Sequence, residues 1–138
     1  LQDHVAPRTL SAVEVKAALA GASRSIYYGV TRVGVDAAGA TANQENRNLL
    51  LSKHAKADSD PVLEILTADV VRCGHAATVG PVDHDALFYL QARGLERRTA
   101  LQLLVSGFFQ SVLGNIALPG VAEELEAAVF AKLATAEL

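Results

Sequence analysis

The pattern of hydrophobic and polar positions changes near residue 80. Before that point, short runs rich in β-branched and aromatic residues are separated by Gly, Asn, Asp and Pro, as expected for a series of strands. None of these runs has the length or the spacing of an amphipathic helix. We therefore predict strands that include residues 13–16, 25–33, 49–51, 62–66 and 70–73.

Two architectures suit such a series of strands, a sandwich or a solenoid. The runs are unusually short, and the segment 42–48 gathers amide side chains beside a turn, where they would stack as a ladder between coils. Both features favour a right-handed parallel β-helix, although the chain shows no clean internal repeat. We predict that residues 1–80 are coils of such a solenoid.

The pattern after Pro81 is typical of helices. Asp83 is a suitable N-cap for a helix over residues 84–93, and Gly94 suits the position just beyond its end. Residues 81–138 are therefore predicted to form a small α-helical domain.

Two further helices complete this predicted domain. The first covers about residues 96–116, with one apolar stripe made by Leu101, Leu104, Phe108 and Val112. Pro119 and Gly120 interrupt the chain. The last helix then continues to the C-terminus, and its apolar side carries Val121, Leu125, Ala128 and Leu133.

Composition and charge restrict the classes of function. The net charge is −3 and the pI is about 5.8, and the basic residues are scattered, which argues against a nucleic-acid partner. No apolar run approaches the roughly 20 residues that cross a bilayer, so no membrane span is predicted. The single cysteine, Cys73, excludes a disulfide within the chain and indicates a reducing compartment, the cytoplasm.

The chain contains no methionine and starts in residues with the pattern of folded structure. We therefore expect a piece of a longer protein. A β-structure that is cut exposes unpaired strand edges, which invite pairing with another chain. This predicts a homodimer or higher homo-oligomer formed through β surfaces.

The strongest candidate for chemistry is the pair Cys73 and His75. On a strand, both side chains lie on one face, because successive residues alternate. A thiol beside an imidazole offers two ligands for iron or zinc, or a nucleophile whose proton the imidazole removes. A third interpretation is structural, with Cys73 as a small buried hydrophobe. One cysteine cannot form a four-thiolate site, so further ligands would come from elsewhere.

No other motif predicts a self-contained site. The chain has no H-x-x-x-H, C-x-x-C or phosphate-loop pattern, and no dinucleotide-binding glycine pattern. His54 and His84 are expected to face solvent, and His4 lies close to the start of the chain. These residues therefore add no second candidate site.

Several blocks of the sequence resemble the C-terminal region of the SufB/SufD family of iron–sulfur cluster assembly proteins. Their order and approximate spacing agree with the family over most of residues 4–110. The upstream segment Ala6–Ser11 is similar as well. The four main blocks are Asn46–Ser52, Leu63–Ile65, Cys73–Gly80 and Leu87–Gly94.

The block Cys73–Gly80 resembles the SufD type more than the SufB type. SufD-like members usually have C-S-H-G-A-T-V-G here, and in this chain Gly74 replaces the serine and Ala76 the glycine. SufB-like members tend to have H-E-A-T-T, and Ala76 stands at the position of that glutamate. The carboxylate of the SufB type is therefore absent.

The resemblance implies a right-handed parallel β-helix core over residues 1–80 and a C-terminal helical domain over residues 81–138. It also implies a complex with SufB and with SufC, an ABC-type ATPase that would dock on the helical domain. Iron–sulfur clusters would form transiently at the interface with SufB, where Cys73 and His75 would be contributed.

The function expected from the resemblance is that of a scaffold subunit of the SUF machinery, not an enzyme. Two alternatives remain from the residues themselves. One is a thiol-dependent enzyme that uses Cys73 and His75, and the other is a purely structural interaction module.

Overall fold

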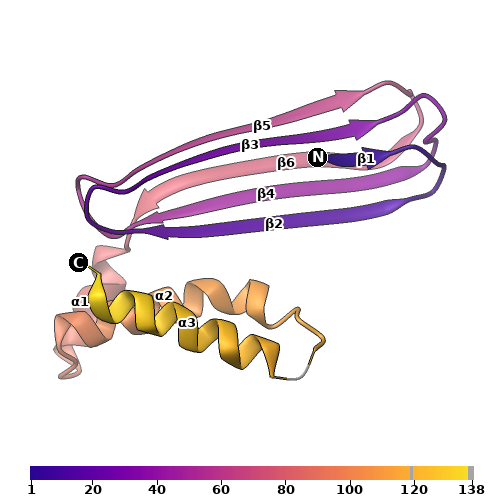
Figure 1. Cartoon of the computed structure of the whole chain (residues 1–138). Coiled ribbons are helices and arrows are strands. Elements are labelled where there is room, and N and C mark those ends of the chain that lie inside the picture. Colours follow the sequence, from indigo (N-terminus) through magenta and orange to yellow (C-terminus); the bar gives the residue numbers. More distant parts are fainter. Residues whose placement is uncertain (119, 137–138) are drawn as a thin grey trace. The chain divides into compact units, whose positions relative to one another are not determined.

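A computed structural model describes residues 1–118 and 120–136, and in it strands come first and helices follow (Figure 1). The strands are β1 (Gln2–His4), β2 (Leu10–Leu19), β3 (Arg24–Val33), β4 (Ala40–Leu50), β5 (Lys56–Ile65) and β6 (Val70–Pro81). The helices are α1 (His84–Ala92), α2 (Arg97–Leu113) and α3 (Val121–Thr135).

The strands form two three-stranded sheets, with the orders β1-β3-β5 and β2-β4-β6. Figure 1 shows the odd-numbered strands running one way and the even-numbered strands running the opposite way. Strands within each sheet are therefore parallel, and β1 pairs with β3 so that Gln2 lies opposite Thr31 and His4 opposite Val33. Each connection carries the chain to the other sheet.

The expected right-handed parallel β-helix is wrong for this chain. The strands form two separate sheets, and no closed solenoid is present in the described part of the chain. The prediction rested on short runs, whereas β2 to β6 are each 10 to 12 residues long. The predicted strands were too short because several strands of the structure continue through polar residues beyond their apolar runs. The amide-rich segment 42–48 lies inside β4 and not beside a turn.

Contacts between residues divide the described chain into two units. The strand unit comprises residues 1–17, 25–48 and 57–79, and the helical unit comprises residues 18–24, 49–56 and those from 80 onward. The helical unit thus includes the turn between β4 and β5 as well as the helices. The predicted domain boundary between residues 80 and 81 stays a prediction.

Much of the interior of the strand unit is polar. Residues 40, 42, 44, 46 and 48 of β4 are all buried, and three of them, Gln44, Asn46 and Asn48, carry amides. The hydroxyl oxygen of Thr31 lies 2.5 Å from Gln2 Oε1 and 2.8 Å from Gln44 Oε1, and Gln44 Nε2 donates to the carbonyl of Gly29 at 3.2 Å. These bonds join the two sheets across the unit.

A second amide cluster follows along β4. Asn46 Oδ1 accepts hydrogen bonds from Asn48 Nδ2 at 2.6 Å and from the hydroxyl of Ser59 in β5 at 2.7 Å. Buried polar groups are usually paired in this way, because an unpaired one loses its hydration without compensation. The network fixes β4 against β5 through directional bonds, whereas an apolar core would allow more ways of packing.

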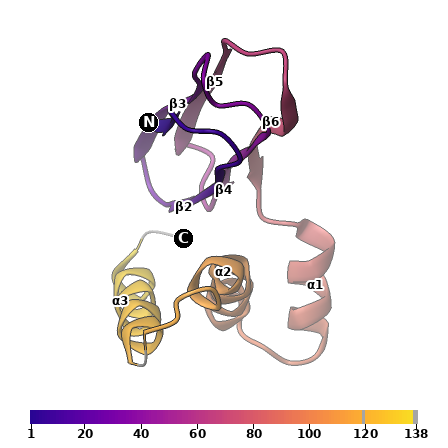
Figure 2. The same ribbon diagram turned by 90° about the vertical axis from the view of Figure 1, so that its right-hand side faces the viewer.

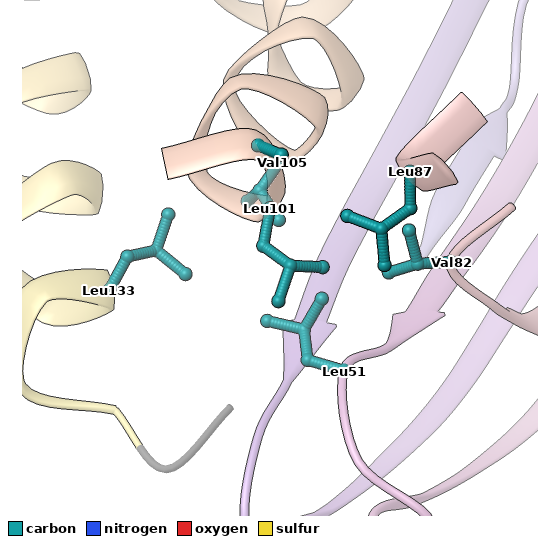
Figure 3. Close-up of a cluster of buried hydrophobic side chains, with 7 residues drawn as sticks. Leu51, Val82, Leu87, Leu101, Val105 and Leu133 are labelled. Atoms are coloured by element: carbon teal, nitrogen blue, oxygen red, sulfur yellow. The ribbon is translucent and has the colours of Figure 1, made fainter. Parts of the chain in front are cut away.

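The apolar core of the helical unit gathers side chains from all three helices and from the adjoining loops. Leu101 and Val105 of α2 are almost completely buried, at 2% and 0% exposure. Figure 3 shows Leu101 between Leu51 and Leu87, with Val82 beside Leu87. The full cluster of buried residues is Leu51, Val82, Leu87, Ala100, Leu101, Val105 and Leu133.

The local signals at α1 are confirmed. The carboxylate of Asp83 accepts hydrogen bonds from the backbone N–H groups of Asp85 at 2.9 Å and Ala86 at 3.3 Å. This satisfies N–H groups that have no partner within the helix. Gly94 follows the helix with φ of +91°, a left-handed conformation that glycine adopts without strain.

The other two helices differ in detail from their predictions. α2 is shorter, and its buried face contains Ala100, Leu101 and Val105 instead of the predicted stripe through Phe108 and Val112. α3 ends at Thr135, where the guanidinium of Arg98 donates to the carbonyl of Leu133 at 3.1 Å and to that of Ala134. Pro119, part of the predicted interruption, lies outside the described residues.

Candidate functional site

Cys73 and His75 lie on β6, which is the outermost strand in the order β2-β4-β6. An outermost strand has a row of backbone N–H and C=O groups without a strand partner, and another chain can pair with it. Figure 2 views the strand ribbons along their length and shows β6 at the margin of its sheet. The candidate pair is thus on a strand that is open to a partner.

The geometry around Gly74 indicates which face of β6 carries the pair. A Cβ atom built on Gly74 would lie 3.8 Å from Oδ1 of Asn43, an exposed residue of β4 between buried neighbours. Gly74 therefore faces outward with Asn43. Because side chains alternate along a strand, Cys73 and His75 are expected to share the opposite face.

The two side chains differ in burial although they share a face. Cys73 is half-buried and packs against an apolar cluster of Val33, Ala37 and Ala40. His75 is exposed. The thiol is therefore supported by the interior of the strand unit, while the imidazole is accessible to solvent or to a partner.

Burial raises the pKa of the Cys73 thiol above its ordinary value, through desolvation of the charged form. A smaller fraction of the thiol is therefore ionised at neutral pH than for a free cysteine. Catalytic cysteines have lowered pKa values, because the thiolate is the nucleophile. The direction of this shift is opposite to the one that activates a catalytic cysteine.

We expect Cys73 to react with iodoacetamide more slowly than free cysteine at pH 7. Since the folded-state pKa is raised, the rate should increase with pH to a midpoint above that of the free thiol, and unfolding in urea should remove the difference. Alkylation quenched at timed intervals between pH 6 and pH 10, with mass spectrometry as the readout, measures the rate and its pH midpoint. A rate at pH 7 above that of free cysteine would restore the thiol-enzyme alternative.

The described residues do not form a complete metal-binding site. No group of three or more His, Cys, Asp and Glu side chains within residues 1–118 and 120–136 is placed to hold a metal ion. Thiolate and imidazole are nonetheless ligands that iron–sulfur centres use. If Cys73 and His75 bind iron, the remaining ligands belong to another chain or to the cluster itself.

The other histidines have different environments. His54 is exposed in the turn after β4, and His84 is exposed at the first position of α1. His4 is buried, with Nδ1 2.6 Å from the hydroxyl of Thr9 and Nε2 2.6 Å from the hydroxyl of Ser11. The burial of His4 was not predicted from the sequence, and the signal for it is the alternation of Gln2 and His4 in a short strand.

A pair of exposed aromatic residues marks a second surface, on α1. Phe88 is 72% exposed and Tyr89 is 57% exposed. The guanidinium of Arg93 lies 5.1 Å from the centre of the Tyr89 ring, a cation–π contact. Large aromatic side chains together with arginine are enriched at protein interfaces, so this surface is a candidate for partner binding.

The helices give no sign of a transmembrane segment. Among the residues that the structure describes, no helix combines the length and the apolar composition that a bilayer crossing requires.

Comparison with known proteins identifies the family. Residues 1–108 match the family model described as "SUF system FeS cluster assembly, SufBD core domain". The chain is 40% identical over 136 residues to an iron–sulfur cluster assembly SufBD family protein of Mycobacterium tuberculosis (strain ATCC 25618 / H37Rv), which covers 94% of this chain and 34% of that protein.

Two proteins named SufD are also similar. The iron–sulfur cluster assembly protein SufD of Bacillus subtilis is 37% identical over 109 residues, which are 79% of this chain and 25% of that protein. SufD of Escherichia coli is 39% identical over 85 residues, which are 62% of this chain and 20% of that protein. The chain spans about a third or less of the length of these relatives. It belongs to the SufBD family of the SUF system, whose members work in iron–sulfur cluster assembly.

Proposed function

We propose that this chain is the part of a SufD-type scaffold subunit that presents Cys73 and His75 to a partner during iron–sulfur cluster assembly. The observation that carries the proposal is the position of both residues on β6, the open outermost strand of a SufBD-family sheet. A scaffold of this kind has no turnover of its own. The cluster is its cargo, held briefly and then passed on.

The chemistry requires a second chain. A cluster needs more ligands than one thiolate and one imidazole, and the described residues offer no third side chain beside them. The partner that completes the site is proposed to be SufB, paired at the edges formed by β5 and β6. Backbone hydrogen bonds along these edges would fix the distance between the ligands of the two subunits.

The raised thiol pKa fits a ligand better than a nucleophile. A half-buried thiol with a raised pKa is largely protonated at neutral pH, and coordination of a cation would remove the proton. This arrangement would protect Cys73 from alkylation and oxidation between rounds of assembly. Exposed His75 would be the first of the two residues to meet an incoming iron ion.

The aromatic surface on α1 is proposed to dock SufC, the ATPase of the system. Phe88 and Tyr89 supply apolar area, and Arg93 supplies a charge beside it. Exposed aromatic residues with arginine form the energetic centre of many interfaces. The helical unit would thus transmit the ATPase cycle to the subunit, while the strand unit handles the cargo.

The chain taken alone is proposed to form a homodimer through the same β5 and β6 edges. Both are the last strands in their sheet orders, so each offers unpaired backbone groups to a second copy. Sedimentation velocity over a concentration series would report the dimer. A monomer at all concentrations would contradict this part of the proposal.

The decisive experiment uses the full-length protein with SufB and SufC, as wild type and as the double variant C73A/H75A. We expect both proteins to form the complex, because the substitutions remove side chains from a strand whose backbone does the pairing. Anaerobic iron and sulfide analysis should then show cluster in the wild-type complex and a decrease of at least tenfold in the variant. Equal cluster content in the wild-type and C73A/H75A complexes would contradict a ligand role for the pair and favour the alternative of a purely structural interaction module.

A matched control separates loss of ligands from loss of histidine in general. His54 is exposed in a turn of the helical unit, so H54A should assemble the complex and retain the wild-type iron and sulfide content. If the wild type fails to bind either SufB or SufC, the scaffold assignment itself is overturned. ATP hydrolysis by the purified subunit without SufC would overturn it as well.

A further inference from the structure

The helical unit contains a cavity that the proposed scaffold function does not use. Its volume is about 480 Å³, and it lies where the turn after β4, the end of β6 and the first residues of α1 and α2 meet. Pockets that bind small molecules typically have volumes of about 300 to 1,000 Å³. The size of this cavity therefore suits a small organic ligand.

The wall of the cavity is apolar. Leu51, Leu87 and Leu101 belong to the buried core of the helical unit and present part of their surface to the cavity. Figure 3 shows these three side chains converging beside Val82. The complete apolar wall consists of Leu50, Leu51, Pro81, Val82, Leu87 and Leu101. Such a wall favours a hydrocarbon body, because its burial removes apolar surface from water.

The polar groups of the cavity are basic. Lys53, His84 and Arg97 line it and are exposed, and no carboxylate lines it. Within the described part of the chain, none of these three side chains makes an ion pair or hydrogen bond. The hydroxyl of Ser52, the remaining lining residue, donates to the carbonyl of Gly21 and accepts from the N–H of Ala55 at 3.2 Å. The available charges are thus positive.

The helix that begins at this cavity adds to the positive potential. α2 starts at Arg97, and its N-cap Glu96 makes no side-chain capping bond. The first N–H groups of α2 therefore lack a side-chain acceptor, and the helix dipole places partial positive charge there. In contrast, the carboxylate of Asp83 already caps α1.

We propose that this cavity binds a small organic anion with a hydrocarbon body, of the class of medium-chain carboxylates. The hydrocarbon part occupies the leucine-lined wall, and the carboxylate lies between Lys53 and Arg97. Charge complementarity carries the choice, since a neutral apolar ligand would leave the basic groups unused and a small inorganic anion would leave the wall exposed. The proposal is independent of the role of Cys73 and His75.

Octanoate, octanol and acetate test the two halves of the proposed ligand. Isothermal titration calorimetry with the full-length protein should give saturable binding of octanoate, with binding at least tenfold weaker for octanol and for acetate. The methyl resonances of Leu87 and Leu101 should shift with octanoate at the same midpoint. Equal affinity for octanol would reduce the site to an unspecific apolar surface and overturn the proposal, as would octanoate binding without shifts at these methyl groups.

Charge variants locate the carboxylate. K53Q/R97Q should weaken octanoate binding about tenfold, and each single variant about threefold, because each removes one exposed positive charge near the anion. K56Q is the matched control, since Lys56 is an exposed lysine of the same unit that does not line the cavity, and it should bind as the wild type does. Unchanged affinity of K53Q/R97Q, or equal weakening by K56Q, would overturn the proposal.

Discussion

Replacement of Leu101 by alanine is expected to lower the free energy of unfolding by about 3 kcal/mol. Leu101 is 2% exposed and lies at the centre of the apolar cluster of the helical unit. Removing its isobutyl group loses the transfer free energy of the buried atoms and leaves a space that neighbouring Leu51 and Leu87 fill only partly. The loss is a large fraction of the stability of a typical domain.

Leu103 provides the control for this substitution. It is on the same helix and is 53% exposed, so L103A makes the same chemical change without opening a core. We expect its effect to be below about 1 kcal/mol. Urea denaturation monitored by circular dichroism, with equal slopes for the three proteins, measures both differences. Equal losses for L101A and L103A would show that the described core does not hold the helices together.

The helices illustrate what local sequence determines. The cap at Asp83 and the end at Gly94 depend on a few neighbouring atoms, and both were predicted correctly. The buried face of α2 was not, because Leu101, Leu103, Leu104 and the neighbouring aromatic residues make this helix apolar on several sides. Which side is buried depends on Leu51 and Leu133, which are distant in sequence.

The strands show a different limit. Polar residues at alternate positions of β4 usually indicate a solvent-facing side, yet Gln44, Asn46 and Asn48 face inward and are almost completely buried. Partners from other strands stabilise the burial of Gln44 and Asn46, which bond to Thr31 and Ser59 respectively. A rule that assigns only apolar residues to the interior therefore predicts too short a strand here. The apparent shortness of the strands in turn favoured a solenoid.

The candidate site combines both situations. The spacing of Cys73 and His75 predicts a shared face of one strand, and both residues do lie on β6. Their different burial could not be predicted, since the apolar cluster against Cys73 comes from Val33 and Ala37. The open edge is likewise a property of the order of strands in the sheet, which no local pattern contains.

Replacement of Thr31 by valine is expected to destabilise the strand unit by about 2 kcal/mol. Valine has the shape of threonine, so packing is preserved and only the hydroxyl is lost. That hydroxyl lies 2.5 Å from Gln2 Oε1 and 2.8 Å from Gln44 Oε1, and all three residues are buried. The hydroxyl has a single proton, so without it one of the two buried amide oxygens loses its donor.

Amide hydrogen exchange of β3 and β4 resolves this effect from events in the helical unit. T31V should reduce the protection of the amides in both strands by about thirtyfold, which corresponds to the expected free-energy loss. T41V is the matched control, because Thr41 lies on the outward side of β4 and its hydroxyl makes no hydrogen bond within the described residues. It should change protection less than threefold. Protection that is unaffected in T31V would mean that the glutamine carbonyls find other donors, and that the polar interior is held by the strands and not by Thr31.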